Sequence, residues 1–192
     1  MTRPEWPVEL TGVTESVVTT LGPNGLWNVA ALGLHAGDPV TATTFGNTRT
    51  RRNFYRQGEG YVLFTRDPVL FVDATLAIRE EDDPVLDAAD AWVEVTVEQV
   101  DVDESGGTRL ETWELTPVDA SVERETVPTI DRGVAAVVEA TVAASRLHVD
   151  TYDAAELRSR LSYFEEVART CGGPRVHEAF DRLRDLVDEG DR

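Results

Sequence analysis

Residues 39–58 carry the residue types that bind a small anion. This stretch contains no Asp or Glu, although the chain of 192 residues has 36 acidic residues against 18 basic ones. It holds four of the arginines: Arg49, Arg51, Arg52 and Arg56. A guanidinium donates two parallel hydrogen bonds to a phosphate and stays charged at every physiological pH. The stretch therefore indicates a binding site for one small phosphate group.

The local order of elements supports this interpretation. We expect a strand over residues 40–45, a turn at Gly46, and a helix over residues 50–57 that Asn47 or Thr48 can cap. A helix N-terminus presents free N–H groups and a partial positive charge. Because successive helical residues are separated by about 100°, we expect at most two of the four arginines to face one ligand. The competing interpretation is a solvated helix whose arginines pair with the surplus carboxylates.

The sequence lacks the residue patterns that other kinds of active site require. His35, His148 and His177 do not have metal-ligand spacing, so no metal site is expected. The single cysteine, Cys171, lies at the end of an expected helix, where a thiol is not activated. The sequence has no G-x-S-x-G elbow, no G-x-x-x-x-G-K-[ST] loop and no G-x-G-x-x-G after a strand. No residue is assigned a catalytic role.

Net charge and hydropathy limit the partners. The formal net charge is −18, and such a surface repels nucleic acid and anionic lipid. No stretch approaches the roughly 20 apolar residues that cross a bilayer, and residues 1–6 lack the apolar core of a signal peptide. We therefore expect a cytoplasmic protein without nucleic-acid or membrane partners. Because the chain has no Lys and many Asp, Val, Thr and Arg, we also expect a halophilic protein that needs molar salt to fold.

The elements around the basic stretch are expected to be β-strands. Strands are predicted over residues 13–21, 26–34, 40–45, 61–65, 91–101 and 110–122, and an Asn-Gly turn joins the first two. Residues 69–78 are expected to form a short helix, and residues 80–83 a turn. Several short strands joined by tight turns indicate a β-barrel or a sandwich.

The last third of the chain changes to helical spacing of apolar residues. One helix is expected over residues 132–148. A second should begin at a cap on Asp150 or Thr151 and end at Cys171, and a third should follow Pro174. We expect residues 1–126 to form the barrel domain and residues 127–192 to form a helical extension.

Three motifs, taken in order, resemble a known family. The sequence NVAALG at residues 28–33 is similar to a P-N-x-A-P-M-G strand. NTRTRRNF at residues 47–54 is similar to a T-x-x-N-L phosphate turn, and TRDPVLF at residues 65–71 to a T-D-D-P-x-L-F segment. These motifs belong to the FMN-binding split-barrel proteins, which include flavin reductases and pyridoxamine-phosphate oxidases. The match is strongest to an archaeal and bacterial branch named only as a domain of unknown function, whose C-terminal extension the helix near residues 131–147 also resembles.

The resemblance implies a mainly β protein, a split β-barrel with a C-terminal helical extension, that forms a homodimer and binds FMN near the subunit interface. Trp27 stands where the family often has Pro, and Ala31-Leu32 replaces its Pro-Met, beside the expected flavin ring. The cofactor-binding residues that the resemblance implies are Val29, Ala30 and Ala31 along the ring; the backbone of Thr43, Thr44 and Phe45 at its edge; Asn47, Thr48, Arg49, Thr50 and Asn53 at the phosphate; and Arg146 from either subunit.

Three functions stay open from the sequence. The first is an FMN-dependent oxidoreductase that uses a small-molecule electron donor or acceptor. The second is a module that binds FMN or another phosphorylated ligand without turnover, since split barrels also hold deazaflavin or haem. The third is a flavin-free interaction protein whose arginines serve solvation or dimer contacts.

Overall fold

The computed structural model describes residues 5–190. Residues 1–4, which contribute to the argument against a signal peptide, lie outside the described residues, as do residues 191–192. The described residues form two compact units, one of residues 5–65 and 79–125, the other of residues 66–78 and 126–190. Residues 66–78 therefore group with the C-terminal helices, although they lie between two barrel strands in the sequence.

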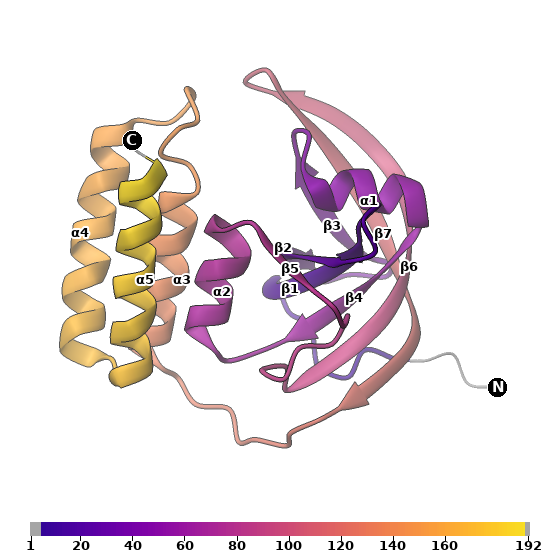
Figure 1. The fold of residues 1–192 in the computed structure, drawn as a ribbon, viewed down its shortest axis with the longest axis horizontal. Helices are drawn as coiled ribbons and strands as arrows, with labels where there is room; N and C mark the ends of the chain where they lie inside the picture. Colours follow the sequence, from indigo (N-terminus) through magenta and orange to yellow (C-terminus); the bar gives the residue numbers. More distant parts are fainter. Residues whose placement is uncertain (1–4, 191–192) are drawn as a thin grey trace. The chain divides into compact units, whose positions relative to one another are not determined.

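The first unit is a closed antiparallel β-barrel (Figure 1). Its closure comes from the pairing of the first two strands over their full length. A short seventh strand, β5 (Arg79–Glu81), adds to the edge of the second strand. The order around the barrel is β1 (Val13–Leu21), β4 (Glu59–Phe64), β6 (Ala91–Ser105), β7 (Thr108–Val122), β3 (Val40–Phe45) and β2 (Trp27–His35).

The barrel core holds helix α1 (Arg49–Gln57) in place. Residues paired across neighbouring strands, such as Val18, Val62 and Val93, are fully buried. Phe54 of α1 joins this core at 1% exposure, and its ring centroid lies 5.2 Å from that of Trp113. Because this aromatic pair is buried, the helix that carries the arginines has a fixed face toward the barrel.

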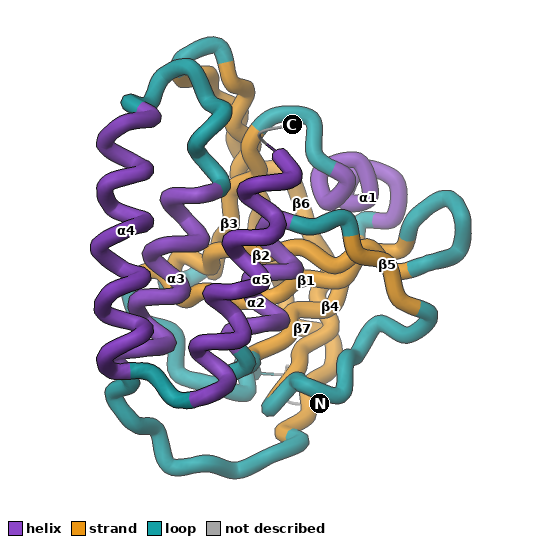
Figure 2. Tube along the Cα trace, turned by 60° about the vertical axis from the view of Figure 1, so that its left-hand side comes forward, coloured by secondary structure: helices purple, strands orange, loops and turns teal. Residues whose placement is uncertain are grey.

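The second unit contains α2 (Pro68–Leu76), α3 (Arg132–Ala144), α4 (Ala154–Cys171) and α5 (Pro174–Gly190) (Figure 2). Two ion pairs join α5 to the segment around α2. Arg175 Nη2 lies 2.6 Å from Asp67 Oδ2, and Arg182 Nε lies 2.8 Å from Asp73 Oδ1. Within residues 5–190, no helix is long and apolar enough to span a bilayer.

The fold confirms the prediction of a split β-barrel with C-terminal helices, and three local predictions are wrong. Residues 79–81 form β5 rather than part of a turn, because Glu80 pairs across from Asn28 of β2. Helix α4 is capped by Asp153 rather than Asp150 or Thr151, since its side chain accepts from the N–H groups of the first turn. Helix α3 ends at Ala144, where tighter turns follow, rather than at residue 148.

Candidate phosphate-binding site

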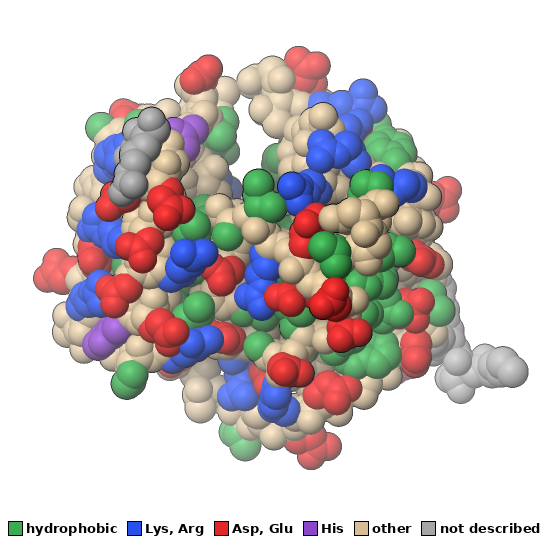
Figure 3. All heavy atoms as spheres, viewed as in Figure 1, with side chains coloured by type: hydrophobic (Ala, Val, Ile, Leu, Met, Phe, Trp, Pro, Cys, Tyr) green, Lys and Arg blue, Asp and Glu red, His purple; other side chains and the backbone are tan. Residues whose placement is uncertain are grey.

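A pocket of about 320 Å³ lies beside α1 in the barrel unit. Figure 3 shows basic side chains gathered over α1 at the upper right of the molecule. The pocket is formed by the turn between β1 and β2, by β2, by β5 and by one face of α1. Its lining residues are Gly22, Pro23, Asn24, Asn28, Arg49, Arg52, Asn53, Arg56 and Glu80.

Three of the four arginines share this pocket: Arg49, Arg52 and Arg56. Positions three and seven residues apart return to within about 60° and about 20° of the same direction on a helix. The spacing of these three therefore places them on one side of the helix; that at most two of them face one ligand stays a prediction. Figure 3 shows that their surroundings are richer in basic than in acidic side chains.

The fourth arginine, Arg51, is turned toward a buried acid. Its Nη2 lies 2.7 Å from Oε1 of Glu111, whose side chain is 0% exposed. Arg109 also donates its Nε–H to that oxygen. The hydrogen bond from Arg51 lowers the pKa of Glu111 to about 2 against the opposing effect of burial, and Arg109 adds to the lowering. Arg51 therefore serves as an anchor of α1 and is not among the pocket-lining residues.

Residues 47 and 48 order the start of α1. The Thr48 side chain caps the helix by accepting from the Arg51 N–H at 3.2 Å, one of the two caps that the sequence allowed. The carbonyl oxygen of Asn47 accepts from Arg52 Nη1 at 3.1 Å, and Asn47 Oδ1 accepts from the same nitrogen at 3.3 Å. These contacts fix the backbone from which the arginines project.

A layer of buried amides and hydroxyls lies under the arginines. Asn28, Thr50 and Asn53 are 6%, 5% and 3% exposed. Asn28 Nδ2 lies 3.5 Å from Thr50 Oγ1, and Asn53 donates to the side chain of Thr20 at 2.9 Å. Asn53 Oδ1 in turn accepts from Arg56. This layer orients Arg56 and joins α1 to β1 and β2.

The pocket also contains one carboxylate, that of Glu80. Its Oε1 lies 2.9 Å from Arg49 Nη1, and its Oε2 accepts from Asn24 Nδ2 at 3.2 Å. Sequence reasoning did not assign Glu80 to the site, because it lies in an acidic run that predicts a solvated turn. The sequence also did not single out Asn24 or Asn28. It named Arg52 and Arg56 among the four candidate arginines but did not decide which of the four line the site.

The barrel is split between β2 and β3. These strands pair only through Leu34 with Ala42 and His35 with Thr41. Continued in register, the next pairs would place Gly33 opposite Thr43 and Ala31 opposite Phe45. Instead, residues 43–45 pair with β7 alone, and residues 30–33 pair with β1 alone. Both strands therefore leave one backbone edge without a strand partner within the described barrel, and such edges can hydrogen-bond a planar ligand.

The predicted ring-side residues other than Val29 lie on these two edges, whereas Val29 pairs with Arg79 of β5. Thr43, Thr44 and Phe45 occupy the end of β3, where Phe45 is 60% exposed. Thr44 is buried and accepts from Trp113 Nε1 at 2.9 Å. On β2, Val29 is buried, and Ala30 and Ala31 are half-buried. Their contacts with a flavin ring stay a prediction.

Arg146 lies in the other compact unit. It follows α3 in a turn, is exposed, and places its guanidinium carbon 5.3 Å from the ring centroid of Tyr152. Its role toward a cofactor stays a prediction.

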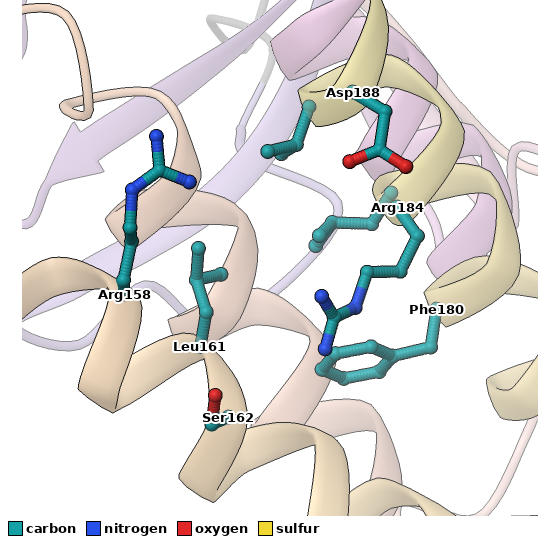
Figure 4. A pocket seen from close by; sticks show the side chains of 8 residues that line it. Arg158, Leu161, Ser162, Phe180, Arg184 and Asp188 are labelled. Atoms are coloured by element: carbon teal, nitrogen blue, oxygen red, sulfur yellow. The ribbon is translucent and has the colours of Figure 1, made fainter. Parts of the chain in front are cut away.

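The helical unit has a second pocket, of about 230 Å³, between α4 and α5. Figure 4 shows Arg158 and Ser162 on one helix and Arg184 and Asp188 on the other, above apolar side chains. Arg184 is paired with Glu165. No group of three or more His, Cys, Asp or Glu within the described residues is placed to hold a metal ion. The pocket beside α1 is lined by three arginines and the pocket in the helical unit by two, so the pocket beside α1 offers more hydrogen-bond donors to an anion.

The antiparallel barrel is followed by helices, and its strands β2 and β3 pair only at one end. These features define the chain as a split-barrel protein. More narrowly, the chain belongs to the family described as protein of unknown function (DUF447). The model of the family's N-terminal domain matches residues 14–124, and a second DUF447 model matches residues 131–185. The resemblance drawn from the three sequence motifs is thus confirmed.

Solved structures agree with this assignment at the level of fold. An FMN-bound protein of the same family from Methanosarcina mazei is 23% identical, with a TM-score of 0.77, over 91% of this chain and 95% of that one. Other solved structures match less closely. The styrene monooxygenase flavin reductase from Pseudomonas putida S12 is 14% identical over 61% of this chain and 93% of its own, with a TM-score of 0.41. Nitrilotriacetate monooxygenase component B from Bacillus cereus is 15% identical over 59% and 71%, with a TM-score of 0.42.

Proposed function

We propose that this protein binds FMN and that the pocket beside α1 receives the flavin's phosphate. The observation that carries the proposal is the shared helix face of Arg49, Arg52 and Arg56 above two buried asparagines. In a chain with a net charge of −18, this face concentrates positive charge at one position. The FMN-bound family member from Methanosarcina mazei supports the choice of ligand.

The donor set fits a phosphate monoester. Three guanidiniums and the single carboxylate of Glu80 leave the pocket a net positive charge. A phosphate monoester carries about −1.5 to −2 charges at pH 7 and three acceptor oxygens. Arginine forks match such oxygens in geometry. Arg52 and Arg56 would hold the phosphate most directly, with Arg49, Thr50 and Asn53 beside them.

The split between β2 and β3 would hold the ring. The free edge of residues 43–45 offers backbone donors and acceptors to the isoalloxazine edge, and Val29, Ala30 and Ala31 offer a mostly apolar wall. When bound, FMN supplies hydride or electron transfer, while the protein orients the flavin and excludes water from it. This division of work agrees with the lack of a recognisable acid–base motif in the chain.

We further propose that the flavoprotein is a cytoplasmic homodimer that exchanges electrons with a small molecule. A non-catalytic FMN-binding module is the alternative, and turnover separates the two. The holoprotein would be mixed anaerobically with reduced nicotinamide and, separately, with reduced deazaflavin. Bleaching of the visible flavin band supports the oxidoreductase, whereas an unchanged band with both donors supports the binding module.

Binding itself is tested by titrating FMN and riboflavin into the protein in high salt and following flavin fluorescence. FMN is expected to bind more tightly than riboflavin, because only FMN has the phosphate. Native mass spectrometry of the purified protein gives an independent readout of the bound mass. Absence of FMN binding in both measurements would contradict the proposal.

A further inference from the structure

The pocket beside α1 already contains an anion of its own. Glu80 is the one acidic residue among those that line it. Its two oxygens accept from Arg49 Nη1 at 2.9 Å and from Asn24 Nδ2 at 3.2 Å. Both donors line the same pocket. The carboxylate therefore occupies hydrogen-bond donors that an incoming phosphate would need.

The strand geometry aims Glu80 at this position. In the pairing of β5 with β2, Glu80 lies opposite Asn28, which also lines the pocket. Neighbouring residues of a strand point to opposite faces. Arg79 and Glu81 accordingly pair with each other, at 2.7 Å between Nη2 and Oε1. Glu80 thus enters the pocket from a paired strand.

The Glu80 contact is weak enough for a ligand to replace. The side chains of Arg49 and Glu80 are 41% and 29% exposed, and ion pairs with this access to water contribute little. A phosphate dianion has a higher charge and more acceptor oxygens than a carboxylate. The phosphate can therefore replace Glu80 as the partner of Arg49, but the Arg49–Glu80 ion pair must break first.

We propose that Glu80 is an internal competitor for the phosphate site, which lowers the affinity of the pocket by holding Arg49 and Asn24 before the ligand binds. The inference rests on the proposed function, because the phosphate that competes is that of FMN. Without Glu80, the same donors would be free when the ligand arrives. The competition sets an affinity below the maximum that the three arginines allow.

The test compares Glu80→Gln with Glu81→Gln, which removes the same charge from the same strand but leaves the pocket unchanged. Dissociation constants for FMN and riboflavin would be measured by fluorescence at fixed KCl. Glu80→Gln is expected to bind FMN about three- to fivefold more tightly than the wild type. Glu81→Gln should change the constant by less than about 1.5-fold, because Glu81 points to the opposite face of the strand and is already paired with Arg79. Riboflavin binding should change in neither variant.

A double-variant cycle separates competition from general charge repulsion. In an Arg49→Ala background, Glu80→Gln should strengthen FMN binding clearly less than in the wild type, because only Asn24 is then left as a contested donor. An unchanged gain in that background would overturn the proposal, and so would weaker FMN binding by the single Glu80→Gln variant. If none of these proteins binds FMN, the proposed function fails instead; FMN binding without a Glu80 effect refutes only the competition.

Discussion

Arg51 Nη2 lies 2.7 Å from Oε1 of Glu111, a carboxylate that is fully buried in the barrel unit. This relationship explains why one of the four arginines is absent from the pocket. The ion pair anchors α1 to the barrel, while Arg49, Arg52 and Arg56 on the other face of the helix line the pocket. Because the carboxylate is fully buried, loss of either of its arginine partners, Arg51 or Arg109, is expected to be costly.

Removal of the Arg51 guanidinium should destabilise the barrel. Arg51→Ala leaves Glu111 buried with the partly exposed Arg109 as its remaining cation. We expect the free energy of unfolding to fall by about 3 kcal/mol. Urea unfolding at constant KCl measures this free energy. Arg160→Ala, which removes an exposed arginine paired with Glu156, is the matched control and should stay within about 0.5 kcal/mol. Equal effects of the two variants would contradict the role of Arg51.

The same pair predicts a pH dependence of stability. The pKa of Glu111 falls from an ordinary 4.5 to about 2 in the folded protein. The folded state therefore binds the proton less well, and the stabilisation is complete above pH 4.5 and is lost as the pH falls toward 2. The depression corresponds to about 3 kcal/mol. Urea unfolding of the wild type and Glu111→Gln between these pH values isolates the contribution, since the stability difference should shrink on acidification. A constant difference would show that Glu111 does not titrate as proposed.

The arginine face predicts a selective loss of FMN. Arg52→Ala and Arg56→Ala each remove a guanidinium from the pocket, and a hydrogen bond to a charged group contributes about 1.5–3 kcal/mol. The FMN dissociation constant should therefore rise by about tenfold or more in each variant. Riboflavin should bind as before, which separates loss of the phosphate contact from misfolding. Fluorescence titration in high salt measures the binding of both ligands, and a parallel loss of riboflavin binding would contradict a role of these arginines in phosphate binding alone.

Net charge predicts a salt requirement. A formal charge of −18 repels itself in dilute buffer, and at about 1 M salt the screening length is only about 3 Å. The melting temperature should rise steeply with KCl. Thermal unfolding followed by circular dichroism tests this, and a melting temperature that does not change with KCl would refute the halophilic interpretation.

The helical unit has its own sensitive position. A Cβ built on Gly133 of α3 would lie 2.6 Å from the Cα atom of Gly172. Backbone cannot yield as a flexible side chain does, so Gly133→Ala should destabilise the protein by about 1–3 kcal/mol. Gly173→Ala, where a Cβ meets nothing within 4 Å, is the control. Equal urea midpoints for the two variants would contradict this close approach.

Local patterns in the sequence predicted most strands and helices, because turns such as Asn24-Gly25 and the alternation of residues 91–101 are encoded by neighbouring residues. The basic stretch also predicted where an anion site would lie. The roles of Arg51 and Glu80 could not be predicted, since each depends on a partner far away in the chain, Glu111 for one and Arg49 for the other. Strand β5 was missed for the same reason: its three charged residues become a strand only by pairing with β2.

The central claim is that the three-arginine face binds the phosphate of FMN. A fluorescence titration of the full chain with FMN and riboflavin, in high salt and with the Arg52→Ala variant alongside, tests it most directly. The wild type should bind FMN at least about tenfold more tightly than riboflavin, and Arg52→Ala should reduce that preference. Equal affinity of the wild type for FMN and riboflavin would contradict the claim.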